Sequence, residues 1–199
     1  MAEVPAQDAG HVSSDEEEVT PGYKAPAKAT LEEIAQKDQD DESLQKYKKA
    51  LLGGDVTDIV TKDGPNVVVE KMALLSEHKV VKEVDLTGDL SKIKDTPFVI
   101  KEGAEFQIQV TFRVNREIVS GLRYSQGTYR KGIRVDKSSF MVGSYGPKNE
   151  AHKYVTAIDE APKGLIARGH YTVKSKFTDD DRISHLEWEW TFDVKKDWE

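Results

Sequence analysis

In FQIQVTFRV (residues 106–114), apolar and polar side chains alternate strictly, and the same alternation returns in LEWEWTFDV (residues 186–194). Successive side chains of a β-strand point to opposite faces of the sheet, so this period predicts strands with one buried and one exposed face. The inward face of the second stretch would carry Trp188 and Trp190. Long strands of this kind predict antiparallel sheets around a shared apolar core.

Similar alternation continues in shorter pieces through most of the chain after residue 63. It predicts further strands at 66–76, 80–86, 97–101, 118–125, 128–135, 139–145 and 171–177. Gly, Pro and Asp separate these stretches, as expected of turns. We therefore predict an all-β fold, an immunoglobulin-like β-sandwich without the cysteine pair, preceded by a flexible N-terminal arm with two short helices.

Charge divides the chain at the same place. Residues 1–60 hold 14 acidic and 6 basic side chains, a net charge of −8, whereas residues 61–199 hold 22 acidic and 23 basic side chains. A segment so charged and so poor in aromatics buries too little apolar surface to offset its ordering entropy. We expect residues 1–62 to form a largely disordered regulatory arm and residues 63–199 to form the sandwich.

Two short helices are expected within the arm, as a hairpin at about residues 30–53. Thr30 followed by Glu33 has the spacing of a capping box, which predicts a helix over 31–37. Asp40 or Asp41 can cap a second helix, and the glycines at 53 and 54 would end it.

The second helix carries an apolar stripe. Leu44, Tyr47 and Leu51 recur at helical spacing, and one short helix cannot bury such a stripe alone. Either the stripe packs on the chain's own sandwich, or the arm folds on a partner surface.

Composition and motifs argue against several function classes. The acidic balance disfavours nucleic acid, and the sequence lacks a long apolar run and a signal-peptide pattern, which predicts a soluble, cytoplasmic protein. No phosphate loop, nucleophile elbow or metalloprotease motif is present, and the five histidines lack metal-ligand spacing. We expect neither an enzyme, nor a cofactor, nor a bound metal.

Two features of the body allow more than one interpretation. Trp188 and Trp190 are either ordinary core or the lining of a cavity between two sheets that do not fully close, which would hold an apolar ligand. A sugar-binding or glycosidase surface is a third interpretation, although Glu187 and Glu189 alternate with the indoles and should face the opposite side. The contiguous acids at 179–181 fit an exposed hairpin turn better than a Ca²⁺ loop.

Several stretches in collinear order over residues 21–199 resemble the Rho GDP-dissociation inhibitors. They are YKAP (23–26), DDESL (40–44), YKKALLG (47–53), VDLTGDL (84–90), FRVNREIVSG (112–121), MVGSYGP (141–147), EAPKG (160–164), FTDDD (177–181) and WEW (188–190). The resemblance implies a protein that binds prenylated Rho and Rac GTPases in the GDP form, extracts them from membranes and blocks GDP release. It also implies a monomer that forms a 1:1 heterodimer, with the geranylgeranyl group held between the sheets and the arm clamped on the GTPase switch regions.

The resemblance also assigns residues. Those expected to contact the GTPase lie in the arm and in the acidic turn, and they are Tyr23, Asp41, Ser43, Leu44, Tyr47, Asp179, Asp180 and Asp181. Those expected to contact the prenyl group are Leu51, Leu52, Leu74, Phe98, Phe106, Ile118, Phe140, Val173 and Trp190.

The sequence departs from the family pattern at two pocket positions, and one other kind of prenyl-binding protein is an alternative. Phe106 and Phe140 stand where tyrosine is usual in the family, which predicts a more apolar pocket mouth. The alternative is a general shuttle for prenylated cargo, of the phosphodiesterase-delta type, a related sandwich that lacks the helical arm. Residues 28–53 therefore favour the inhibitor.

Overall fold

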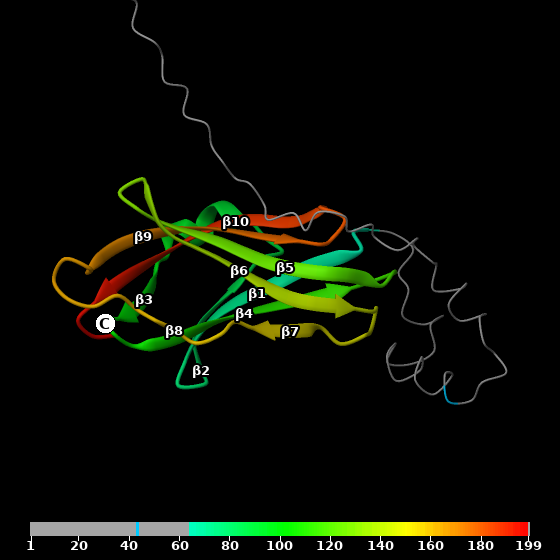
Figure 1. The fold of residues 1–199 in the computed structure, drawn as a ribbon, viewed down its shortest axis with the longest axis horizontal. Coiled ribbons are helices and arrows are strands. Elements are labelled where there is room, and N and C mark those ends of the chain that lie inside the picture. The colour runs from blue at the N-terminus through cyan, green and yellow to red at the C-terminus, as the bar shows by residue number, and fades with distance from the viewer. Residues whose placement is uncertain (1–42, 44–63, 199) are drawn as a thin grey trace, which may run out of the picture.

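The computed structural model describes Ser43 and residues 64–198, and the strands of the second part form two sheets (Figure 1). Ten strands and one 3-10 helix follow one another in this part of the chain. They are β1 (Val67–Ser76), β2 (Lys79–Asp85), η1 (Leu90–Asp95), β3 (Phe98–Lys101), β4 (Glu105–Val114), β5 (Val119–Arg130), β6 (Ile133–Tyr145), β7 (His152–Val155), β8 (Asp159–Glu160), β9 (Gly169–Thr178) and β10 (Ser184–Lys195).

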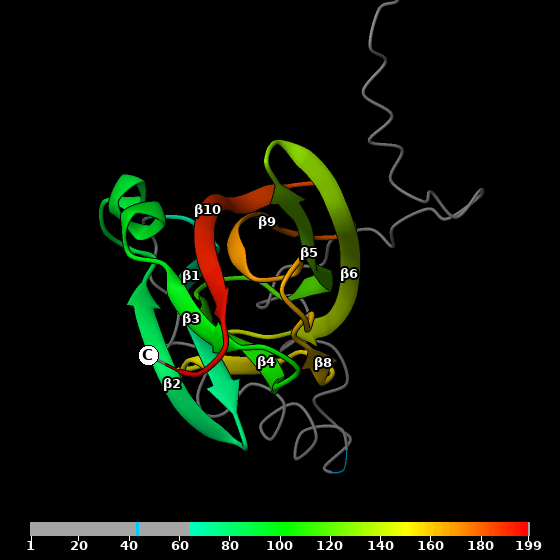
Figure 2. The same cartoon turned by 90° about the vertical axis from the view of Figure 1, so that its left-hand side faces the viewer.

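The first sheet has the strand order β2-β1-β4-β7, with β8 paired to the start of β4, and the second has the order β3-β10-β9-β5-β6. Every pairing is antiparallel except that of β10 with β3, which is parallel. Viewed along its length, the molecule shows the two sheets facing each other across one core (Figure 2). The prediction of an all-β sandwich is confirmed at the level of two packed sheets.

Period-2 alternation places the core as the sequence predicts. On β4, Ile108, Val110, Phe112 and Val114 are all buried, while Phe106 at the strand's start is half-buried. On β10, Trp188, Trp190 and Phe192 face the same interior. These side chains come from the facing surfaces of the two sheets. The sheets therefore bury each other's inner faces, and no helix layer is needed to cover them.

One predicted strand is wrong. Residues 128–135 do not form a single strand, because β5 ends at Arg130 and β6 begins at Ile133. Lys131 and Gly132 between them both have positive φ, at 51° and 81°. This is the backbone of a tight two-residue hairpin turn, whose twist matches the flanking strands. Tyr129, Ile133 and Val135 hold the odd positions of an alternating stretch, which favours a single strand. Arg130 and Lys131 are nevertheless two polar residues in succession and Gly132 follows them, and this break marks the turn.

Three short elements went unpredicted: β7, β8 and η1. β8 has only two residues, too few for alternation to be recognised, and β7 places His152, a polar residue type, at a buried position. The 3-10 helix begins after Asp89, whose carboxylate accepts a hydrogen bond from the backbone N–H of Ser91.

The predicted division at residues 62 and 63 lies at the edge of what the structure describes and stays a prediction. Just beyond it, the Asn66 side chain accepts hydrogen bonds from the backbone N–H groups of Arg116 and Glu117, each at 2.9 Å. Within the part of the chain that the structure describes, no helix has the length and apolar character needed to cross a membrane.

Candidate functional site

The interior between the sheets brings together four of the predicted prenyl-contact residues. Leu74, Phe98, Val173 and Trp190, from β1, β3, β9 and β10, are all fully buried in one cluster. The rings of Phe98 and Trp190 meet edge to face, with centroids 5.3 Å apart, and Trp190 lies opposite Val173 in the β9–β10 ladder. This part of the predicted set forms a packed apolar centre.

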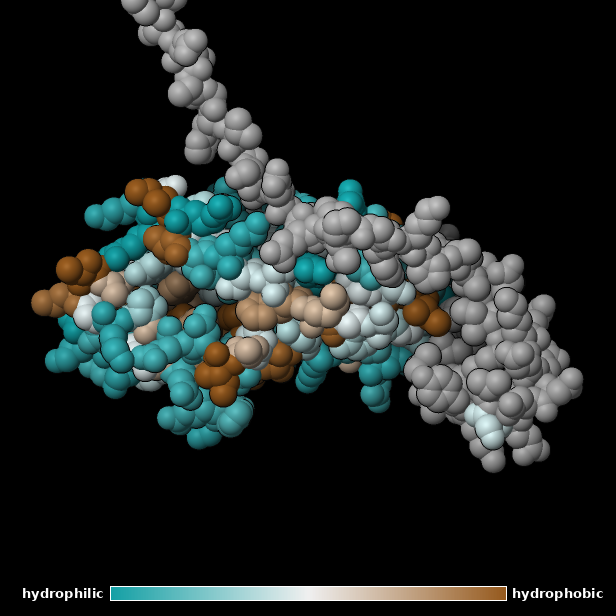
Figure 3. All heavy atoms as spheres, in the orientation of Figure 1, coloured by the Kyte–Doolittle hydropathy of each residue, from teal (hydrophilic) through white to brown (hydrophobic). Residues whose placement is uncertain are grey.

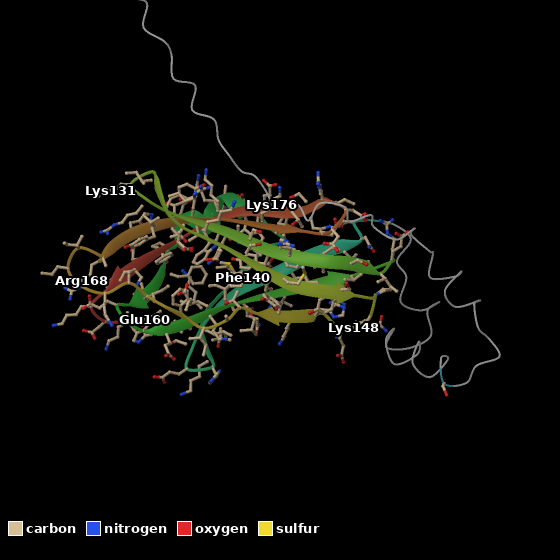
Figure 4. The ribbon with its side chains drawn as sticks, in the orientation of Figure 1. Lys131, Phe140, Lys148, Glu160, Arg168 and Lys176 are labelled. Atoms are coloured by element: carbon tan, nitrogen blue, oxygen red, sulfur yellow. The ribbon has the colours of Figure 1, made fainter. Side chains whose placement is uncertain are left out.

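Two other predicted prenyl-contact residues lie at the margin of that centre, and a third, Ile118, is placed apart from it. Phe106 on β4 and Phe140 on β6 are half-buried and pack against the core. Phe140 stacks on the buried Tyr124 ring with a centroid distance of 6.1 Å, and Figure 4 labels it midway along β6. Ile118 is half-buried just before β5 and is not among the side chains packed against the described core.

A chain of polar groups runs through the interior and was not predicted. The Trp190 indole N–H donates to Ser175 Oγ at 3.0 Å, and Ser175 Oγ lies 3.0 Å from the hydroxyl of Tyr124. The Tyr124 hydroxyl donates to Gln126 Oε1 at 3.0 Å, so its single proton is used there and Ser175 must be the donor to Tyr124. Each group in the chain therefore has one defined hydrogen-bond direction.

Burial raises the pKa of Tyr124, and the hydrogen bonds from Ser175 and Trp190 only partly oppose this shift. The phenol therefore stays neutral and acts as a hydrogen-bond donor. The sequence does contain a sign of these internal hydrogen bonds. Ser175 is a polar residue at an inward position, between Val173 and Phe177 of the alternating strand.

Trp188 differs from Trp190 in one respect. Both indoles are buried, and Trp188 stacks on Tyr124 with centroids 5.8 Å apart, but its Nε1 has no hydrogen-bond partner among the described residues. A buried donor left unpaired costs about 1–3 kcal/mol. With both indoles inside, neither offers a face on which a sugar could stack.

The acidic turn between β9 and β10 directs its first carboxylate inward. Asp179 accepts hydrogen bonds from the backbone N–H of Ile183 at 2.9 Å and from His185 Nε2 at 3.0 Å. The side chains of Asp179 and His185 are only 5% and 9% exposed. Of the three predicted acidic contacts, Asp179 thus organises the turn, whereas Asp180 is half-buried and Asp181 is exposed.

Gly121 supports this turn from the neighbouring strand. It lies in an irregular part of the β5–β6 ladder and has φ of 61°. A Cβ atom placed there would come within 2.0 Å of the Asp180 carboxylate. The backbone N–H of Asp180 also donates to the carbonyl of Ser120 at 3.2 Å. The position of Asp180 therefore depends on a glycine at 121.

Comparison with known proteins decides the family. The family model described as "RHO protein GDP dissociation inhibitor" matches residues 8–197. The chain belongs to the Rho GDP-dissociation inhibitor family. It is 52% identical over 186 residues to Rho GDP-dissociation inhibitor 1 of Homo sapiens, covering 93% of this chain and 91% of that protein. It is also 52% identical over 184 residues to Rho GDP-dissociation inhibitor 3 of Bos taurus, covering 92% and 81%.

Among solved structures, a Niemann-Pick type C2 protein from the Japanese carpenter ant is similar with a TM-score of 0.43 and 10% identity, over 67% of this chain and 96% of that one. That similarity is too weak to indicate a function. The Rho GDP-dissociation inhibitor resemblance seen in the sequence is confirmed by the family model and by the curated relatives.

Most of the predicted arm contacts of this family member lie outside the described residues. They are Tyr23, Asp41, Leu44, Tyr47, Leu51 and Leu52, and they stay predictions. Ser43 is described and is exposed. Within residues 64–198, no group of three or more His, Asp or Glu side chains is placed to hold a metal ion.

Proposed function

We propose that this chain inhibits GDP dissociation from prenylated Rho-family GTPases and carries them away from membranes as a cytoplasmic 1:1 complex. Membership of the family carries this proposal, and the apolar interior with its half-exposed aromatic margin supports it. The chain regulates rather than catalyses. The geranylgeranyl group is taken up between the sheets, with Phe106 and Phe140 as the first aromatic side chains that it meets.

Burial of the prenyl chain cannot by itself drive extraction from the membrane. Burying a twenty-carbon chain is worth on the order of 15 kcal/mol relative to water, at about 0.8 kcal/mol per carbon, but a bilayer offers a similar gain. Extraction is therefore an exchange between two apolar phases, and protein contacts to the GTPase must drive it. The acidic turn suits that purpose, because it can pair with the basic tail that would otherwise attract the GTPase to anionic lipid.

Inhibition of nucleotide release requires no chemical step. GDP leaves when the switch loops open, and an arm that folds only on their closed form shifts the population away from opening. Leu44 and Tyr47 would carry this contact, since they share the apolar stripe of the second predicted helix.

A comparison of adjacent residues on β6 tests the lipid half of the proposal. Phe140 faces the core margin, whereas its neighbour Met141 is 56% exposed on the other face. We expect Phe140→Ser to weaken extraction of geranylgeranylated, GDP-loaded Rac from liposomes by about tenfold, and the matched control Met141→Ser to leave it unchanged. Equal behaviour of the two variants would contradict a lipid site at this margin.

A second variant, assayed with the same prenylated Rac and liposomes, separates the clamp on the switch loops from the lipid site. The rate of GDP release should rise in the double variant Leu44→Ala, Tyr47→Ala, and the prenyl chain should still be bound. If the parent chain binds a prenylated cargo that is not a Rho-family GTPase equally well, the general shuttle is the better description. If it binds no prenylated protein at all, the proposed function is wrong.

A further inference from the structure

One end of the sandwich presents aliphatic side chains to solvent on a rigid loop. Between β8 and β9, Leu165 and Ile166 are 81% and 88% exposed. At the tip of the neighbouring β5–β6 hairpin, Ile133 is 70% and Val135 54% exposed. Figures 1 and 3 show the hairpin tip and the β8–β9 loop at the same end of the molecule, with separate hydrophobic areas at that end and hydrophilic surface between them. We call these four residues the apolar tip.

The loop is held firmly although its apolar side chains are exposed. Arg168 forms a two-point ion pair with Glu102, through Nε at 2.9 Å and a terminal nitrogen at 2.6 Å, and the backbone N–H of Gly164 donates to the same carboxylate at 3.0 Å. These hydrogen bonds hold the pKa of Glu102 at about 2, so its carboxylate is ionised at neutral pH. The hydroxyl of Tyr171 donates to the carbonyl of Ala167 at 2.6 Å.

Arg130 ties the loop to the hairpin. Its guanidinium lies 5.1 Å from the centre of the Tyr171 ring and donates to the carbonyl of Arg168 at 2.8 Å. The hairpin and the loop therefore form one surface, and the exposure of Leu165 and Ile166 is part of a fixed structure. Exposed aliphatic side chains gathered at one end and held there by such contacts are available for an interaction.

The charges around the apolar tip indicate what it contacts. Cations border it, namely Arg130, Lys131, Lys163 and Arg168, and Figure 4 labels Lys131 and Arg168 at this end. The nearby carboxylates are Glu102, Glu160 and Asp197, which pair with Arg168, Lys163 and Lys101. Arg130 and Lys131 are left as an excess of positive charge. At the far end of β9 lies the acidic turn of residues 179–181, so charge is separated along the strand.

We propose that the apolar tip and its bordering cations form a contact site for anionic lipid surfaces. Aliphatic side chains that enter the interface, together with Lys and Arg that pair with lipid headgroups, are the pattern of reversible peripheral binding. An anionic surface would also repel the acidic turn, and so orient the sandwich with that turn facing away. This site is separate from the interior that takes the prenyl group, and it requires no GTPase.

Vesicle binding by the full chain, without any GTPase, tests this site. We expect binding to vesicles of phosphatidylcholine with about a third phosphatidylserine to exceed binding to phosphatidylcholine alone, and to weaken as salt is raised. The double variant Leu165→Ser, Ile166→Ser should lose about tenfold in partition coefficient, and Lys131→Gln should lose about fivefold. The control is Ile183→Ser, at an exposed aliphatic residue between the acidic turn and β10, which should bind like the parent.

Three outcomes would overturn the proposal. They are absence of binding to either vesicle, equal binding by the parent and the double variant, and equal loss in the Ile183→Ser control. If the chain bound neither vesicle, a protein partner would be the remaining explanation for the exposed apolar tip. Because no GTPase is present, failure here is distinguishable from failure of the proposed inhibitor function.

Discussion

The sandwich interior and the β9–β10 turn are supported in different ways. The interior is held by packing of large apolar side chains from both sheets, with one polar chain through Tyr124 and Ser175. The turn has little apolar support, and it is held by hydrogen bonds to the Asp179 carboxylate and by the close approach of Asp180 to Gly121. A packed apolar interior can tolerate variation in detail as long as volume is kept. A site that presents carboxylates depends on individual polar contacts.

The largest loss of stability should come from a substitution at the centre of the interior. Trp190→Ala removes the indole that packs on Phe98 and donates to Ser175. We expect it to lower the free energy of unfolding by about 3–5 kcal/mol, because the cavity cannot close and the Ser175 hydroxyl loses a donor. Urea denaturation followed by fluorescence measures this. A loss below about 1 kcal/mol would mean that Trp190 is not central to the core.

Gly121→Ala should have the next largest effect and act on the turn. The new Cβ would overlap the Asp180 carboxylate, so we expect a loss of about 1–3 kcal/mol together with displacement of the turn. Gly132→Ala is a matched control, because Gly132 also has positive φ but has no atom within 4 Å of the Cβ position. Amide spectra should show shifts at residues 179–183 in the first variant only. If both variants lost the same free energy of unfolding, backbone strain at a positive φ would explain the loss, and overlap with Asp180 would not.

Tyr124→Phe tests the polar chain inside the core. It removes the donor to Gln126 and the acceptor for Ser175, so we expect a loss of about 1–2 kcal/mol in the free energy of unfolding. A double-mutant cycle with Ser175→Ala should give a coupling energy of about 0.5 kcal/mol or more. Strict additivity of the two substitutions would show that the two hydroxyls do not interact.

The smallest change in stability should come from Trp188→Phe, and comparison with Trp190→Phe shows how the two indoles differ. Trp188→Phe loses volume but also removes a buried N–H that has no partner among the described residues, and these changes oppose one another. We expect a net change within about 1 kcal/mol, whereas Trp190→Phe should cost more because it breaks the hydrogen bond to Ser175. Thermal unfolding of both variants gives the comparison. The reverse order would show that Trp188 has a partner in solution.

The interior part of the predicted site could be placed from sequence better than the acidic turn. Alternation along β9 and β10 is enough to place Val173 and Trp190 in the interior, and their burial confirms this placement. The same reasoning treats Asp179, Asp180 and Asp181 alike, whereas the structure gives them three different environments. Their difference arises from Ile183, His185 and Gly121, and no local pattern links position 121 to position 180.

The order of amino acids is enough to give the family, the all-β class and the buried faces of the long strands, because period-2 alternation and collinear motifs are local properties of the chain. The hydrogen bonds that join Trp190 and Tyr124 through Ser175, the inward position of Asp179 and the placement of the apolar tip beside Arg130 arise only in the folded protein. These contacts depend on the register between strands and on the course of the turns. Register is set by the packing of the whole sandwich rather than by any one segment.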